Sequence, residues 1–212
     1  MKTVYFFSGL GADERVFRNL VLKPCNAVHI PWILPFEKET LEDYATRLTK
    51  DISMNDAIFI GLSFGGIIAL EVAQRLKVSQ LIIISSVKTQ IEIPFYFKLL
   101  RLVPLHHWIP ASLITKPNFI TRWLFGVNTS EEIALLEQVM TDMDIAFFRW
   151  AVNSIIHWEN EAIPANTVHI HGSADRIFPL RFVSPSQVIP RGGHFFVFSQ
   201  PTEISELINS FL

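Results

Sequence analysis

The sequence has little of what marks several large classes of protein. Cys25 is the only cysteine in 212 residues, so no internal disulfide can form, and it fits best as a small apolar filler. No stretch reaches the ~18 apolar residues of a membrane span. Near the N-terminus the uninterrupted apolar run covers only residues 4–7, which is short for a signal-peptide core. We therefore expect a soluble cytoplasmic protein with no stable membrane insertion.

Basic charge is also scarce. The chain carries 18 Lys and Arg against 20 Asp and Glu, and the cations are scattered rather than clustered. A nucleic-acid backbone is usually met by clustered cations, so we expect no nucleic-acid partner. No spacing of His, Cys, Asp and Glu is typical of a metal site, and we expect neither a metal nor a cofactor. The sequence does not indicate an oligomeric state.

Apolar residues, in contrast, make up half of the chain, which is enough for one well-buried domain. Short apolar runs recur, and turn residues and helix-like segments follow them. Such runs are typical of strands buried on both faces, and they cover residues 3–7, 27–30, 57–61, 81–85, 167–172 and 186–189. Segments with helical spacing cover residues 13–22, 41–52 and 64–76. This alternation predicts an α/β fold with a mostly parallel sheet of about six strands flanked by helices.

Residues 87–160 interrupt this alternation. They contain no convincing strand but do contain helix-like stretches over 95–103 and 130–140, separated by several prolines. The gap is too long for a plain crossover helix. We predict an inserted helical cap that ends in a crossover helix around residues 142–158. The core would then consist of residues 1–86 and 161–212.

Three glycines surround one serine at the end of the third predicted strand. Residues 61–65 read G-L-S-F-G, and a predicted helix follows. A serine in a sharp turn from strand to helix adopts a strained backbone, and side chains two residues away would collide with the turn. Gly61 and Gly65 clear that space around Ser63, and Gly66 lets the helix lie close to neighbouring strands.

Two further motifs follow in order. "GSADRIFP" comes after the strand over 167–172 and contains Asp175, and "RGGHFF" comes after the last predicted strand and contains His194. With the G-x-S-x-G turn, these segments resemble the nucleophile elbow, acid loop and histidine loop of the α/β-hydrolase fold superfamily. The resemblance covers nearly the whole chain apart from the insertion. It implies a catalytic triad of Ser63, Asp175 and His194.

In such a triad the imidazole accepts the serine proton, and the carboxylate holds the imidazole in the required tautomer. The resemblance also implies two backbone N–H donors for the oxyanion. One is Phe64, which follows the serine. The other is Leu10 in the loop after the first strand, where this chain has Ser8 at a position that is commonly histidine in the family.

Each of these residues also has a structural interpretation. Ser63 could serve only as a helix N-cap, Asp175 only as a turn residue, and His194 only as a structural histidine. The presence of all three motifs favours the triad.

Other polar residues favour structural roles. His169 and His171 alternate along a predicted strand, where packing or loop hydrogen bonds are expected, and His106 and His107 have no acidic neighbour in sequence. Asp13 most simply caps the first helix, with contact to a substrate as the alternative.

The insertion is rich in aromatic residues, and some of them should line the substrate pocket. The candidates are Phe95, Trp108, Phe119, Trp123, Phe125 and Trp150.

The leading hypothesis is a cofactor-independent serine hydrolase that cleaves an ester or thioester of a small, largely apolar acyl substrate through an acyl-enzyme. The same fold and triad also serve carbon–carbon bond hydrolases, lyases and peroxidases. A ligand-binding protein that retains the hydrolase fold and turns over negligibly is a further alternative.

Overall fold

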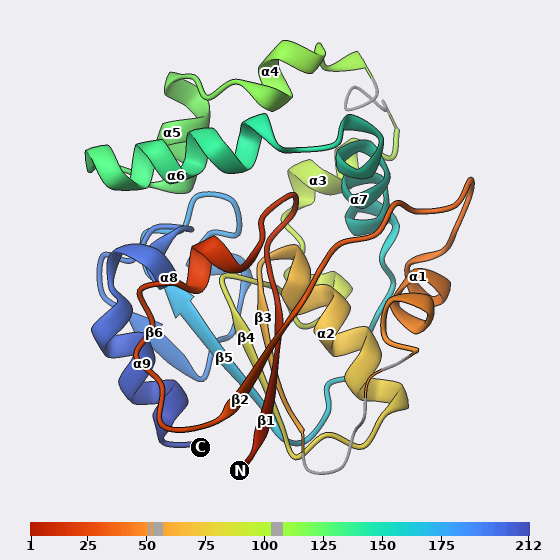
Figure 1. The fold of residues 1–212 in the computed structure, drawn as a ribbon. Helices are drawn as coiled ribbons and strands as arrows, with labels where there is room; N and C mark the ends of the chain where they lie inside the picture. The colour runs from red at the N-terminus through yellow and green to blue at the C-terminus, as the bar shows by residue number, and fades with distance from the viewer. Residues whose placement is uncertain (51, 53–56, 103–107) are drawn as a thin grey trace.

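The computed structural model describes residues 1–50, 52, 57–102 and 108–212. Six strands form one sheet in the order β2-β1-β3-β4-β5-β6, and every neighbouring pair is parallel (Figure 1). The strands are β1 (Thr3–Phe7), β2 (Asn26–Ile30), β3 (Ile58–Leu62), β4 (Gln80–Ile84), β5 (Thr167–Gly172) and β6 (Gln187–Ile189). The predicted fold class and strand positions are confirmed, with ends that differ by about a residue.

The central strands are apolar throughout because both faces of the sheet are covered. Successive strand residues point to opposite faces. In β4, Leu81 and Ile83 belong to one core cluster, whereas Ile82 and Ile84 belong to the other. All four side chains are 0% exposed. Polar side chains at alternate positions of β4 would be buried on one face of the sheet, away from water, which is why this strand does not alternate.

Helices cover both faces. One core cluster contains residues of α1 (Leu41–Leu48), α2 (Phe64–Arg75) and α7 (Ile145–His157). The other contains residues of the 3-10 helix η1 (Glu14–Phe17), α6 (Ser130–Thr141), α8 (Phe196–Ser199) and α9 (Pro201–Asn209). α7 supplies the crossover expected around residues 142–158.

Between β4 and β5 the part of the chain that the structure describes forms helices and no strand, and these helices lie within the predicted insertion, residues 87–160. It contains η2 (Gln90–Glu92), α3 (Phe95–Leu99), α4 (Ala111–Thr115), α5 (Phe119–Phe125), α6 and α7. Figure 1 shows these helices beyond the carboxyl ends of the strands, with α4 farthest from the sheet. The insertion therefore lies over the edge at which parallel-sheet proteins bind ligands.

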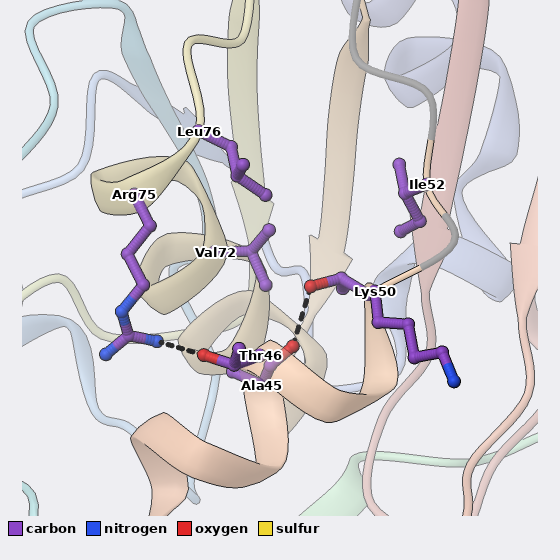
Figure 2. A pocket seen from close by; sticks show the side chains of 8 residues that line it. Ala45, Thr46, Lys50, Ile52, Val72, Arg75 and Leu76 are labelled. Carbon is purple, nitrogen blue, oxygen red and sulfur yellow. Dashed lines mark hydrogen bonds between the residues drawn. The ribbon is translucent and has the colours of Figure 1, made fainter.

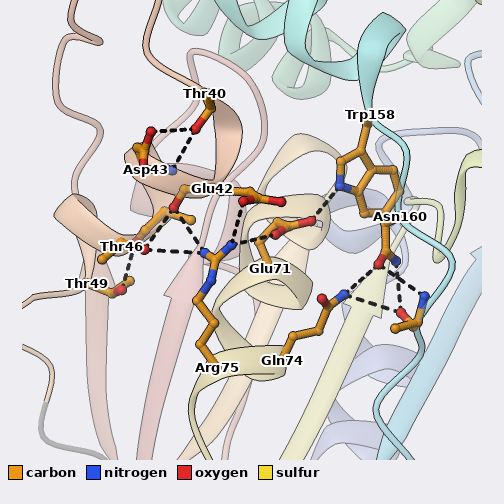
Figure 3. Close-up of polar contacts among 12 residues, drawn as sticks. Thr40, Glu42, Asp43, Thr46, Thr49, Glu71, Gln74, Arg75, Trp158 and Asn160 are labelled. Atoms are coloured by element: carbon orange, nitrogen blue, oxygen red, sulfur yellow. Dashed lines mark hydrogen bonds and ion pairs between the residues drawn. The ribbon is translucent and has the colours of Figure 1, made fainter.

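Polar contacts tie the two ends of the insertion to α2 (Figure 3). The indole N–H of Trp158 donates to the buried carboxylate of Glu71 at 2.7 Å. Gln74 donates to the side-chain oxygen of Asn160 at 2.7 Å, and Asn160 in turn donates to the carbonyl of Lys88 at 2.8 Å. The beginning and the end of the insertion are thus tied to each other and to the C-terminal half of α2.

The prediction of a helix over residues 13–22 is wrong beyond the first turn, since only the short 3-10 helix η1 forms there. The backbone N–H of Val21 donates to the Ser205 hydroxyl at 2.9 Å, and that of Lys23 donates to the Asn209 side chain at 2.7 Å. Both partners lie on α9. Hydrogen bonds to α9 thus replace those that a longer helix would make. Within the described residues, no helix is long and apolar enough to cross a membrane.

Candidate active site

Ser63 lies in the turn between β3 and α2. Its φ of 53° and ψ of −119° place it in a region that residues other than glycine rarely adopt. Its N–H donates to the carbonyl of Ile84 in β4 at 2.8 Å, and its own carbonyl accepts from the Ser86 hydroxyl at 2.8 Å. The strained turn is therefore held on both sides by the neighbouring strand. A partly buried serine with positive φ thus stands between a strand and a helix, which is the backbone geometry that the sequence predicted for this turn.

The glycines around Ser63 allow close backbone packing. A Cβ at Gly61 would overlap the backbone of Gly65 and Gly66, and a Cβ at Gly66 would overlap the side chain of Ser86 after β4. A Cβ at Gly65 would overlap the carbonyls that end β1, so this glycine serves the approach of α2 to that strand. The sequence suggested that Gly65 clears space around Ser63, whereas in the structure it allows α2 to approach the end of β1.

The structure brings the three predicted site residues together. The Ser63 hydroxyl oxygen lies 2.9 Å from Nε2 of His194, and Nδ1 of His194 lies 2.8 Å from Oδ2 of Asp175. His194 and Asp175 are buried, at 3% and 4% exposure. Residues separated by 131 and 19 positions in the chain therefore form one continuous hydrogen-bonded row.

Asp175 is fixed by the loop after β5. Its second carboxylate oxygen accepts from the backbone N–H groups of Ile177 and Phe178, each at 2.9 Å. Burial by itself would raise the pKa of this carboxyl, but the charge and hydrogen bond of His194 outweigh it and hold the pKa below its usual value. Asp175 is therefore an anion beside the imidazole.

His194 lies between the insertion and the sheet. The ring centroids of Phe125 from α5 and Phe178 lie 5.5 and 5.9 Å from that of His194. The N–H of Phe195 donates to the carbonyl of Phe125 at 3.2 Å, which joins the histidine loop to the end of α5. Phe125 belongs to the aromatic residues expected near the site, whereas Phe178 was missed because it lies outside the insertion.

A buried pair of histidines lies behind Asp175. Nε2 of His171 is 2.7 Å from the carbonyl of Phe178, which can only accept, so this nitrogen carries a proton. It also lies 3.5 Å from Oδ2 of Asp175. Burial lowers the pKa of His171, against the opposing charge of Asp175, so the ring is neutral. Its Nδ1 then accepts from Nε2 of His169 at 3.1 Å.

His169 is also neutral, because burial, followed by the neighbouring His171 and Lys88, lowers its pKa to about 2. Its Nδ1 is buried with no hydrogen-bond partner among the described residues. The sequence led us to expect hydrogen bonds from these histidines to a loop, and His171 does bond to the Phe178 carbonyl. Its proximity to Asp175 was not predictable from the spacing of residues in the sequence. His106 and His107 lie outside the described residues.

The loop after β1 lies beside Ser63. A Cβ on Gly9 would be 3.8 Å from Cβ of Ser63. The Gly9 carbonyl accepts from the N–H of Ala12 and from the indole N–H of Trp32, each at 3.0 Å. Because a trans peptide directs its C=O and N–H to opposite sides, these bonds turn the Leu10 N–H away from them.

Ser8 stabilises the same loop, since its hydroxyl donates to the carbonyl of Ala12 at 2.6 Å. Phe64 begins α2, where backbone N–H groups have no partner within the helix.

An aromatic cluster lies next to this loop. The ring centroids of Trp32 and Trp150 lie 5.5 and 6.0 Å from that of Phe64, and Phe147 lies 6.2 Å from it. Of these, only Trp150 was among the predicted pocket aromatics; Trp32 and Phe147 were missed. Four of the predicted aromatics are at least half exposed instead, namely Phe95, Trp108, Phe119 and Trp123.

A cavity of about 300 Å³ adjoins the Gly9 loop, and Ser8, Trp32 and Asp13 contribute to its wall. Asp13 caps η1 by accepting from the N–H of Arg15 at 3.0 Å, as expected, and it also forms an ion pair with that arginine. The alternative of a substrate contact is compatible with its place in the cavity wall.

A second hollow, of about 200 Å³, lies between α1 and the far end of α2 (Figure 2). Its described wall has no histidine or carboxylate. The wall consists of Ala45, Thr46, Thr49, Lys50, Ile52, Val72, Arg75 and Leu76. Because α2 begins after Ser63 and rises ~1.5 Å per residue, this hollow is more than ten ångströms from the serine. It does not belong to the site.

The comparisons with known proteins concern the family and the fold. Residues 24–207 match the model of the alpha/beta hydrolase family. A hydrolase from Oleispira antarctica is structurally similar, with a TM-score of 0.76 and 16% identity over 100% of this chain and 90% of that chain. None of the curated protein sequences matches this chain significantly.

Two further solved structures are similar. A lipase-esterase related protein from Clostridium acetobutylicum has a TM-score of 0.69 and 18% identity over 100% of this chain and 94% of that chain. A bromoperoxidase from Bacillus anthracis has a TM-score of 0.68 and 15% identity over 99% of this chain and 91% of that chain. At such identities the likeness concerns the fold, which proteins of different activity share.

Proposed function

Because the chain belongs to the alpha/beta hydrolase family, we propose that it is a serine hydrolase that cleaves an ester or thioester of a small, largely apolar acyl substrate. The observation that carries this proposal is the hydrogen-bonded row from the Ser63 hydroxyl through His194 to Asp175, with distances of 2.9 and 2.8 Å. A serine hydroxyl alone keeps its proton at neutral pH. An imidazole at this distance can accept it as attack begins.

In the proposed reaction, Ser63 Oγ attacks the acyl carbon while Nε2 of His194 takes the hydroxyl proton. The Asp175 carboxylate accepts from Nδ1–H and stabilises the imidazolium that forms. The leaving group departs with the proton from Nε2, which leaves an acyl-enzyme. Water, deprotonated by His194, then attacks the acyl carbon, and the carboxylic acid product and free Ser63 result.

The oxyanion of each tetrahedral intermediate would accept from the backbone N–H groups of Phe64 and Leu10. The location of the Gly9 loop beside Ser63 and the orientation of its peptide support Leu10 as the second donor. Each such donor contributes about 3 kcal/mol to barrier reduction. The roles of both residues are proposals.

The aromatic residues near Phe64 support an apolar acyl group. Trp32, Phe147 and Trp150 offer ring faces and edges, since the indole N–H groups of Trp32 and Trp150 already donate to the carbonyls of Gly9 and Glu39. We propose that the insertion acts as a cap that closes over this part of the site. A cytoplasmic location would suit the single cysteine, Cys25, and is likewise a proposal.

The test is hydrolysis of p-nitrophenyl esters of graded acyl length by the purified chain and by Ser63→Ala. We expect the variant to lose about 10⁴-fold or more in kcat. Ser210→Ala, at an exposed hydroxyl after α9, is the matched control and should retain full activity. Equal rates for the wild type and Ser63→Ala would exclude Ser63 as the nucleophile.

Parallel assays with dienone acids and a peroxidase substrate distinguish the proposed hydrolase from other reactions of this fold, and thioesters and lactones show which acyl substrates it takes. Turnover confined to the dienone acids or to the peroxidase substrate would replace the proposed ester or thioester hydrolysis while leaving Ser63 as the reactive group. Binding without turnover of any substrate would favour the ligand-binding alternative.

A further inference from the structure

The insertion exposes an unusual amount of apolar surface. Six large apolar side chains on or next to α3, α4 and α5 are between 52% and 83% exposed. With Trp123 we call them the apolar face: Phe95, Leu99, Trp108, Leu113, Phe119 and Ile120. A single exposed apolar residue is ordinary, but so many within about thirty residues of chain are not. Such a face indicates a partner.

The parts of the apolar face are linked through the loop after β5. The Arg176 guanidinium lies 4.7 Å from the Trp123 ring of α5 and donates to the carbonyl of that residue at 2.6 Å. One residue further along, the Ile177 carbonyl accepts from the hydroxyl of Tyr96 in α3 at 3.0 Å. α3 and α5 therefore flank one loop. Figure 1 shows α3, α4 and α5 together beyond the carboxyl ends of the strands.

The charge of this part of the chain differs from that of the rest. Residues 93–130 contain four Lys or Arg and no Asp or Glu, whereas the other residues carry 14 basic and 20 acidic groups. Arg101 and Arg122 form ion pairs with carboxylates that follow later in the chain. Lys98 and Lys116 are exposed and have no carboxylate partner among the described residues.

The loop after β5 adds two cations at the same place. Arg176 and Arg181 are exposed, and the Arg181 guanidinium lies 4.8 Å from the Phe182 ring. Phe182 contacts Phe95 and Tyr96 of α3, each at a centroid distance of 6.2 Å. Exposed arginines therefore lie against aromatic rings of α5 and of the loop after β5, beside α3. This combination is typical of protein surfaces that lie at the headgroup level of a membrane containing anionic lipid.

We infer that the apolar face of α3, α4 and α5 docks on an anionic lipid surface, with aromatic and aliphatic side chains among the acyl chains and Lys98, Lys116, Arg176 and Arg181 at the headgroups. Within the described residues no helix could span the bilayer, so the proposed contact is with the lipid surface. α5 and α3 also contact the site, through Phe125 against His194 and Phe97 against Phe178. Docking would therefore bring lipid within reach of Ser63.

Vesicle flotation tests this inference without using catalysis. The probe is Ser63→Ala protein mixed with phosphatidylcholine vesicles, either alone or with about 30 mol % phosphatidylglycerol. We expect about tenfold stronger partitioning into the anionic vesicles and loss of most of that difference at about 0.5 M salt, where charges are screened. A blue shift of tryptophan emission should accompany binding, because Trp108 and Trp123 are exposed in the free protein.

Matched variants locate the contact. Phe119→Asp should lower partitioning about tenfold or more, and Lys116→Glu several-fold. Val21→Asp is the apolar control, since Val21 is 75% exposed in the body of the protein, and Lys77→Glu, in the loop before β4, is the charge control. Both controls should bind as the unaltered protein does. Circular dichroism establishes that each variant is folded.

Three results would overturn the inference. One is an absence of binding to anionic vesicles at low salt, and another is an equal loss for Val21→Asp and Phe119→Asp. The third is a dimer that Phe119→Asp dissociates, in a protein that does not bind vesicles, because the apolar face would then be an interface between two copies. A failure of vesicle binding leaves the proposed hydrolase chemistry of Ser63 untouched.

Discussion

The site residues at the edge of the sheet and the exposed residues of the insertion differ in burial and in the number of contacts that hold them. In the sheet, polar groups at the site are held by several partners each, and Asp175 accepts three hydrogen bonds while it is 4% exposed. In the insertion, Phe119 is 82% exposed. The sheet therefore supplies rigid geometry for chemistry, whereas the apolar face on α3, α4 and α5 of the insertion consists of side chains that are not packed in the core. Stability and activity should respond to changes in the first region far more than to changes on the apolar face.

The largest difference should come from the acid of the triad. Asp175→Asn keeps the shape of the side chain but replaces an anionic acceptor by a neutral amide, which no longer fixes the His194 tautomer or stabilises its charge. We expect kcat for ester hydrolysis to fall about 10⁴-fold. Asp43→Asn, at an exposed carboxylate of α1, is the control and should be unchanged. A loss below tenfold for Asp175→Asn would remove this residue from the proposed triad.

A pair of phenylalanine variants compares the two regions directly. Phe59 is 0% exposed in β3, and Phe59→Ala should lower the free energy of unfolding by about 3–5 kcal/mol through lost burial and the cavity left behind. Phe119→Ala deletes the same atoms from an exposed position and should change that free energy by less than ~0.5 kcal/mol. Urea denaturation measures both. Similar losses would mean that Phe119 is packed in solution and that the two regions do not differ as described.

The buried histidine pair makes the stability of the sheet region dependent on pH. His169 and His171 have pKa values below the ordinary value of 6.5 in the folded protein, so below pH 6.5 the unfolded chain binds more protons. Their contribution is fully present above pH 6.5 and decreases as the pH falls. His169, with a pKa of about 2 in the folded protein, adds about 1.4 kcal/mol per pH unit to that loss, and His171 adds to it in the same direction.

Urea denaturation between pH 6 and 5 tests this expectation. His169→Phe should reduce the slope of unfolding free energy against pH by about one proton, or ~1.4 kcal/mol per pH unit. His157→Phe, at an exposed ring at the end of α7, serves as the control and should leave the slope as it is. An unaltered slope for His169→Phe would show that His169 is charged in the folded protein.

The sequence predicted the sheet region well because its signals are local. Runs such as residues 81–85 are apolar on both faces, and the turn around Ser63 requires glycines at fixed positions. Motif order also placed Asp175 and His194, although only the fold brings them within hydrogen-bond distance of each other and of Ser63.

Features that depend on distant partners were not predictable. The expected helix over residues 13–22 stops after one turn, and the amides of Val21 and of Lys23 just beyond it donate instead to Ser205 and Asn209 of α9. Trp32 approaches the Gly9 loop and Phe64 through folding alone, and no local pattern marks it as a neighbour of the site. The contact of His171 with Asp175 depends on the path of the loop after β5.

Covalent labelling of Ser63 by a fluorophosphonate probe tests the central claim most directly, because it reports on the serine before any substrate is known. We predict one adduct per chain, located by mass spectrometry on the peptide containing Ser63, and labelling slowed at least about 100-fold in His194→Ala. An adduct on another residue, or equal labelling rates with and without His194, would contradict the account of Ser63 as a nucleophile activated by that histidine.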